Sequence, residues 1–256
     1  MLKNFTQSLR IEVAPQALRL LRAPRWGKAA PALLAEQALA AAPDALAAAL
    51  PGALDALLSG QQARGLAASF VLADELVRMW QVVPPLQAAR LADLEAAAAL
   101  RFHTLYGEAP AAWQMSADWN AAAPFMAAAV PRALQAAIES SAARHALAVI
   151  AVVPHFVAAW NRHARALKRD AWFGVAHGNV LALAACEGGQ LRALRHIAIP
   201  HGADHYWLTQ TAQREALLLG LQAPALIQLS GEVPPALAKP AGHDKHIATA
   251  ALGAAA

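Results

Sequence analysis

Three strand-like runs separated by two tight turns, between residues 170 and 200, constrain the fold more than any other part of the chain. The segment DAWFGVAHGNVLALAACEGGQLRALRHIAIP has a His-Gly-Asn turn after its first apolar run and an acidic Gly-Gly turn after its second. Glycine in a short connection between alternating apolar runs is a strong local sign of a β-hairpin. We therefore predict an antiparallel β-meander here, in a chain that otherwise favours alanine-rich helices.

A similar pattern opens the chain. Residues 9–24, LRIEVAPQALRLLRAP, alternate on both sides of Ala14-Pro15-Gln16, which predicts a hairpin with its turn at these three residues. The Ala/Leu-rich residues 29–60 are interrupted by proline and glycine and predict two or three short helices. Further along, we expect strands at 67–72, 77–83, 111–119, 123–130, 148–154 (buried) and 225–231, and helices at 86–107, 132–147, 155–168 and 205–221.

The meander followed by a helix and a strand occurs twice, at 9–83 and at 170–231. Two halves of this kind, each a mixed sheet covered by helices, predict an α/β protein with the actin-like fold, a duplicated ribonuclease-H-like unit. We expect the halves at residues 1–120 and 121–232. The tail, residues 233–256, is rich in Pro, Ala and Gly without periodicity, which predicts disorder.

Composition excludes several classes of function. The formal charge is +4, but the basic residues are scattered as single arginines rather than in blocks, so we expect no nucleic-acid partner. The longest apolar run, residues 146–160, is shorter than the roughly 20 residues of a membrane-spanning helix, so we expect no transmembrane segment. The one cysteine, Cys186, lies in an apolar strand pattern and predicts a buried, unreactive thiol.

Several segments, in order, resemble degenerate actin-like proteins of bacterial pilus and type II secretion machines. These are the PilM- and MshI-type pilus assembly proteins and the cytoplasmic domain of GspL-type proteins. The resemblance covers about residues 9–231 and rests on order and hydrophobic pattern. The segments are LRIEVAPQALRLLRAP, SFVLADELVRMWQVVPP, the helix ending RFHTLYG, AAWQMSADW, VVPHFVAAWNRH and WFGVAHGNVLALAACEGGQLRALR.

The resemblance also implies where a nucleotide would bind. Active members hold phosphates at two hairpin turns that each supply an Asp, and adenosine beside a strand that ends in Ser/Thr-Gly-Gly. Here the turns are Ala14-Pro15-Gln16 and His177-Gly178-Asn179, neither with a carboxylate, and Pro15 lacks an N–H. Only Ser230-Gly231 keeps the family pattern, with Glu232 in place of the second Gly. We expect a degenerate cleft with no catalytic residue and no cofactor, although ATP binding stays an alternative.

By the same resemblance, the protein would be cytoplasmic and peripheral to the inner membrane. It would bind the cytoplasmic N-terminal peptide of a bitopic inner-membrane assembly protein. Arg78 and Trp80 alternate onto one face of the predicted 77–83 strand and are candidates to line the groove, with a core position as the alternative for Trp80.

Two other functions stay open at this point. One is an active actin-like ATPase. The other is a metal-dependent enzyme that uses His201 and His205, whose spacing would place both on one helix face. Against the metal site, Pro200 and Gly202 favour a loop, and Asp204 stands where the following helix needs an N-cap. We therefore expect no metal.

Overall fold

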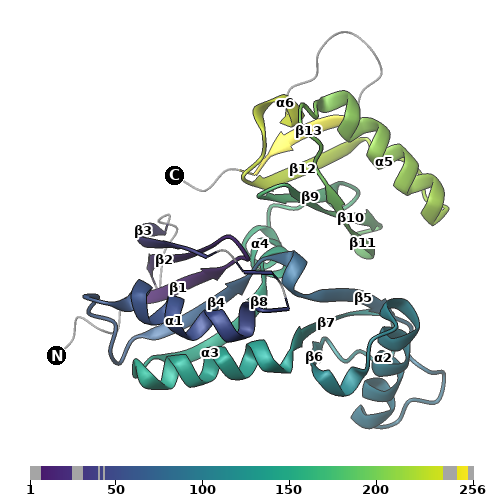
Figure 1. Cartoon of the computed structure of the whole chain (residues 1–256). Coiled ribbons are helices and arrows are strands. Elements are labelled where there is room, and N and C mark those ends of the chain that lie inside the picture. The colour runs from purple at the N-terminus through teal and green to yellow at the C-terminus, as the bar shows by residue number, and fades with distance from the viewer. Residues whose placement is uncertain (1–6, 25–30, 40, 43, 239–246, 253–256) are drawn as a thin grey trace. The chain divides into compact units, whose positions relative to one another are not determined.

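The computed structural model describes residues 7–24, 31–39, 41–42, 44–238 and 247–252 (Figure 1). The chain divides into two compact units, Met1–His155 and Phe156–Ala256. The boundary predicted at residue 120 falls inside the first unit. The reason is that α3 and β8, which come after that residue, pack and pair with elements near the N-terminus.

The first unit is built on a five-stranded sheet with the order β3-β2-β1-β4-β8. Strands β1, β2 and β3 form an antiparallel meander, and β4 and β8 add to it in parallel. Helices α1 and α3 lie side by side against it (Figure 1). The bounds are β1 Gln7–Val13, β2 Ala17–Pro24, β3 Ala32–Ala38, α1 Leu46–Leu58, β4 Ala67–Leu72, α3 Arg132–Arg144 and β8 Ala148–Pro154.

The second unit repeats this strand order as β11-β10-β9-β12-β13. The meander predicted from the glycine turns is confirmed, and β12 and β13 again pair in parallel. Even the irregularity between the second and third strands recurs, at Leu20/Leu21 and at Ala185/Cys186. The bounds are α4 His155–His163, β9 Trp172–His177, β10 Val180–Glu187, β11 Gln190–Ala198, α5 His205–Leu219, β12 Leu226–Gly231, α6 Pro235–Ala238 and β13 Ala248–Ala251.

Between β4 and α3, the first unit carries a small insertion with its own core. Its three-stranded antiparallel sheet has the order β5-β7-β6 and packs on α2. The α2 helix ends where Gly107 takes the left-handed conformation (φ 68°) that glycine favours. The elements are η2 Asp74–Leu76, β5 Arg78–Val82, α2 Leu91–Tyr106, η3 Pro110–Ala112, β6 Trp113–Ala117 and β7 Phe125–Pro131.

Three predictions of secondary structure are wrong. The described residues of the range 29–60 form a strand, β3, and one helix, α1, because pairing with β2 overrides the helical preference of Ala and Leu. The strand β8 lies at a sheet edge, and Ile150 is 57% exposed rather than buried. The described parts of the tail contain α6 and β13, with Leu237 fully buried and β13 paired with β12, and the prediction of disorder for residues 239–246 and 253–256 lies outside the described residues.

None of the helices in the described ranges combines the length and the apolarity needed to cross a membrane.

Candidate functional site

The hairpin turns β1–β2 and β9–β10 occupy equivalent positions in the two units. The N–H of Ala73, just after β4, donates to the carbonyl of Val13, the last residue of β1, at 2.8 Å. The N–H of Glu232, just after β12, donates in the same way to the carbonyl of Ala176 in β9, also at 2.8 Å. Val13 therefore corresponds to Ala176, and Ala73 corresponds to Glu232.

Counting on from these residues, the turn Ala14-Pro15-Gln16 corresponds to His177-Gly178-Asn179, so Pro15 stands at the position of Gly178. In the first turn, the N–H of Ala14 donates across the hairpin to Ala17 at 3.0 Å. The next residue is Pro15, and because proline has no N–H it offers no donor. The first turn therefore lacks the backbone group that its counterpart has.

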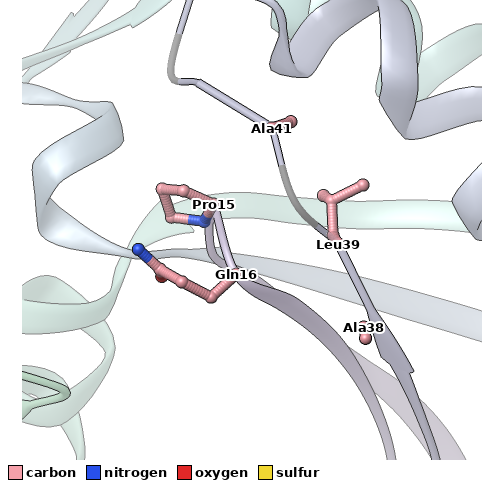
Figure 2. Close-up of a pocket in the computed structure, with 5 residues that line it drawn as sticks. All are labelled: Pro15, Gln16, Ala38, Leu39 and Ala41. Atoms are coloured by element: carbon pink, nitrogen blue, oxygen red, sulfur yellow. The ribbon is translucent and has the colours of Figure 1, made fainter.

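The carbonyls of the first turn are also engaged. The N–H of Leu39 donates to the Gln16 carbonyl at 2.8 Å, and the N–H of Ala41 donates to the Pro15 carbonyl at 3.3 Å. These residues line an open recess of about 590 Å³ with Ala38 (Figure 2). Apart from the Gln16 amide, the side chains that line the recess are apolar, so it offers little to a charged phosphate.

The second turn carries a donor, and this donor is bound to a carboxylate. Gly178 takes the left-handed conformation (φ 54°), and its N–H donates to Oε2 of Glu232 at 3.4 Å. The same oxygen lies 4.0 Å from Nδ1 of His177. Gly231 also has a positive φ, of 86°, and a Cβ at this residue would lie 2.2 Å from the Ala176 carbonyl oxygen. Only glycine fits there, and it leads the chain into Glu232.

A serine and a histidine meet beside this turn. Ser230 is buried, and its hydroxyl lies 3.0 Å from Nε2 of His163 at the end of α4. Burial lowers the pKa of His163, and the charge of Arg162 lowers it further, so the imidazole is neutral near pH 7. Sequence reasoning found Ser230 but missed His163, because nothing in the helix pattern points to a partner 67 residues away.

The strand β12 holds the segment after α4 through a second polar side chain. Gln228 is buried, accepts from the N–H of Lys168 at 2.6 Å and donates to the carbonyl of Ala166 at 3.1 Å. Gln228 and Ser230 alternate onto one face of β12. Ser230 and Gly231 pair with Val175 and Ala176 of β9, which places them directly before the turn of His177 and Gly178.

The candidate groove residues have different surroundings. Trp80 is 3% exposed, and its ring lies 5.2 Å from that of Phe102, centroid to centroid. Arg78 lies over the rings of Tyr106 at 5.6 Å and Trp113 at 5.3 Å. Both side chains face α2, as their alternation predicts, but that face is the core of the insertion. Trp80 therefore has the core position that was its alternative.

Arg78 lies at the margin of that core. Its Nε and a terminal nitrogen both donate to one carboxylate oxygen of Glu108, at 3.3 and 3.2 Å. Side chains of this pair are about one-third exposed, at 33% and 36%. The guanidinium is thus stacked on two aromatic rings and paired with a carboxylate within its own unit.

His201 and His205 have different environments. His201 is exposed in the turn before α5, and His205 is buried as the first residue of that helix. Asp204 accepts from the N–H of Trp207 at 3.0 Å, so the predicted N-cap is confirmed. In the described part of the chain, no three His, Cys, Asp or Glu side chains are grouped as a metal ion would require.

Cys186 is buried, as predicted. Burial raises the pKa of its thiol to about 11. Since the thiolate is the nucleophilic form, this thiol is unreactive near neutral pH.

No protein-family model and no curated protein sequence matches the chain. Several solved structures do match. The cytoplasmic domain of EpsL, an inner-membrane component of the type II secretion system of Vibrio cholerae, aligns over 89% of this chain and 83% of its own, with a TM-score of 0.57 and 13% identity. The PilM–PilN type IV pilus biogenesis complex aligns over 90% of this chain and 83% of its own, with a TM-score of 0.61 and 18% identity.

A third structure names the fold. A Bacteroides thetaiotaomicron protein of unknown function with an actin-like ATPase fold aligns over 90% of this chain and 82% of its own, with a TM-score of 0.56 and 9% identity. The chain has the actin-like fold. The fold class predicted from the repeated meander is confirmed. The likeness to actin-like pilus and type II secretion proteins is also confirmed, at the level of the fold.

Proposed function

We propose that the protein is a catalytically inactive actin-like scaffold. Its partner would be the cytoplasmic N-terminal peptide of a bitopic inner-membrane protein, in a type IV pilus or a type II secretion-like assembly. The fold likeness to the EpsL cytoplasmic domain and to the PilM–PilN complex supports this class of assembly. In this proposal, the protein lies in the cytoplasm, and the membrane-spanning partner holds it at the inner membrane.

The observation that carries the inactive role is the chemistry of the two turns. A nucleotide needs backbone N–H donors for its phosphates and carboxylates that hold Mg²⁺. Pro15 provides no donor in the first turn, and the Gly178 N–H of the second turn is bound to the Glu232 carboxylate. A negative carboxylate at that donor repels a phosphate group. At these two positions, neither turn therefore offers the free N–H donor that ATP hydrolysis would need.

Peptide titration tests the scaffold role directly. Synthetic cytoplasmic N-terminal peptides of candidate bitopic pilus and secretion proteins would be titrated into the full chain by calorimetry, with scrambled peptides as controls. We expect saturable binding with a Kd near the micromolar range, about −8 kcal/mol, for one native peptide and none for its scrambled form. If a well-folded protein binds none of the peptides, the proposal loses its mechanism.

A thermal shift with ATP·Mg tests the inactive role. A ligand at about 100 times its Kd stabilises a protein by about 2.7 kcal/mol, which is several degrees for a domain of this size. We expect a shift below about 1 °C at millimolar ATP·Mg, well short of that size. A shift of several degrees with ATP·Mg but not with AMP would instead support the ATPase alternative. Stoichiometric zinc, lost on replacing His201 and His205 with Ala, would support the metal enzyme.

A further inference from the structure

We infer that residues 162–169, at the end of α4 and before β9, form a contact site for an anionic lipid bilayer. Under the proposed function, a membrane-spanning partner alone holds the protein at the inner membrane, so a direct contact with lipid goes beyond it. The inference rests on that proposed location only where it chooses a bilayer over other polyanions.

The segment RHARALKR, residues 162–169, is dense in basic residues. Four of its eight residues are Arg or Lys and none is acidic, whereas the whole chain has 21 basic residues in 256. The spacing hides this density, because only Lys168 and Arg169 are adjacent. All four basic residues, Arg162, Arg165, Lys168 and Arg169, are exposed. A cluster of four or more such residues is attracted to the negative surface potential of an anionic leaflet.

The acidic side chains beside the segment do not neutralise it. Asp170, which follows directly, accepts from the N–H of Gly188 at 3.2 Å. Glu187, at the same β10–β11 turn, is paired with Arg192 at 3.1 Å. Within the described ranges, neither Arg165 nor Lys168 forms an ion pair. Their charges are therefore available to an external anion.

The fold holds the backbone of the segment in place. The buried Gln228 accepts from the N–H of Lys168 at 2.6 Å and donates to the carbonyl of Ala166 at 3.1 Å. The carbonyl of Arg169 accepts from the N–H of Gly189 at 2.8 Å. A segment fixed in this way presents its basic side chains without the entropy cost of ordering a loop on binding.

The composition of the segment favours a bilayer over a nucleic acid. Sites for single-stranded nucleic acids combine basic side chains with aromatic rings on which bases stack. Residues 161–171 contain no Phe, Tyr or Trp. A bilayer surface requires only charge, and each Lys or Arg near it raises the affinity about fivefold.

Vesicle co-sedimentation of the full chain tests the inference. The probes are vesicles of phosphatidylcholine with about one-third phosphatidylglycerol, and vesicles of phosphatidylcholine alone. The test variant is Arg165→Gln/Lys168→Gln, which leaves Arg169, whose Nε donates to the Gly188 carbonyl at 3.2 Å. The matched control is Arg64→Gln/Arg101→Gln, at two exposed positions of the first unit. Both variants lower the net charge by the same amount, so only position distinguishes them.

We expect the wild type to bind the anionic vesicles saturably and the neutral vesicles not at all. The test variant should bind about 25-fold more weakly, and the control should stay within about twofold of the wild type. No binding by the wild type, or an equal loss in both variants, overturns the inference. Tighter binding of a single-stranded oligonucleotide than of the anionic vesicles would indicate a nucleic-acid partner and would also overturn it.

A measurement on the wild type keeps the inference testable if the test variant does not fold. The amine of Lys168 reacts with an N-hydroxysuccinimide ester, and mass spectrometry gives its rate. We expect this rate to be at least about fivefold lower with anionic vesicles than with neutral ones. An unchanged rate on vesicle-bound protein would mean that the segment does not touch lipid, which overturns the inference. The peptide titration contains no lipid, so failure of the scaffold proposal is recognised separately.

Discussion

The two units place five strands in the same order, yet their equivalent hairpin turns differ in chemistry. The first turn has no N–H at Pro15, whereas the second has the N–H of Gly178 and binds it to Glu232. The strand order depends on pairing along whole strands, which single turn residues hardly affect. Binding of an anion depends on one N–H group. The two units therefore share a strand order while the N–H donor is absent from one turn and bound to a carboxylate in the other.

The units also differ in the segment that connects the fourth strand to the fifth. The first unit inserts β5, α2, β6 and β7 before α3 and β8, whereas in the second unit only residues 232–234 separate β12 from α6. The fifth strand is present in both units, as β8 and β13. Four predictions test this comparison, from the largest expected effect to the smallest.

Truncation after Glu232 should have the largest effect, because it removes the fifth strand from the second unit only. Leu237 is 0% and Ile247 is 7% exposed, and each buried side chain of this size contributes about 1.5–3 kcal/mol. We expect the free energy of unfolding to fall by about 3–6 kcal/mol, measured by urea denaturation. The milder variant Thr249→Val, which removes the bond to Ala238, should cost about 1 kcal/mol. Unchanged stability after truncation would mean that β13 and α6 do not stabilise the second unit.

Trp80→Ala should remove much of the stability of the insertion, which only the first unit has. Truncating a fully buried aromatic residue costs about 3–5 kcal/mol. Trp80→Phe is the matched control, because the Trp80 Nε1 has no hydrogen-bond partner among the described residues and a ring is retained. We expect the Phe variant to keep most of the stability in thermal unfolding. A well-folded Trp80→Ala variant that loses only peptide affinity would restore the groove assignment.

Gly231→Ala should destabilise the second unit, although its counterpart in the first unit, Leu72, is not a glycine. The added methyl group would lie 2.2 Å from a backbone oxygen at a positive φ, so we expect a loss of about 2–4 kcal/mol. Gly220→Ala is the control: its φ is also positive, 66°, but a Cβ would have nothing within 4 Å, and the cost should be about 1 kcal/mol. Equal losses in the two variants would show that the approach to Ala176 is unimportant.

The smallest effect concerns pH, and only the second unit has the His163–Ser230 pair. The pKa of His163 is lowered from 6.5 by burial, so the unfolded chain binds a proton more readily than the folded one. Stability should therefore decrease as pH falls from 6.5 through the lowered pKa. His163→Gln should remove this part of the pH dependence in denaturation curves recorded at several pH values. A His163→Gln variant with the same slope as the wild type would contradict the assignment.

Much of the fold could be predicted from the sequence because local chemistry and global pairing agree. The glycine turns of the second meander, the Asp204 N-cap of α5 and the Gly107 end of α2 each specify their element within a few residues. The strand β3 could not be predicted, since its segment ALLAEQA favours a helix and becomes a strand only by pairing with β2. The strand β13 was missed for a similar reason, because an Ala-rich stretch shows no alternation to mark its pairing with β12.

For the candidate site, too, the sequence predicts the local features and misses the long-range contacts. The turn residues could be predicted from the sequence, since proline and glycine act through their own backbones. The contacts of Glu232 with Gly178 and of Ser230 with His163 span 54 and 67 residues. No local pattern reports such distant partners. For Trp80, the alternation along the strand correctly predicted which side chains share its face. It could not predict that α2 covers this face.

The high pKa of the single cysteine makes the chain ready for site-specific labelling. At pH 7, a thiol with a pKa of about 11 is a thiolate in only about one molecule in ten thousand. An exposed cysteine introduced into each unit, for example at Ala48 in α1 and Gln213 in α5, would therefore react with a maleimide dye while Cys186 stays unmodified. Such a doubly labelled chain would report, by energy transfer, whether the two units change their separation when a partner peptide is added.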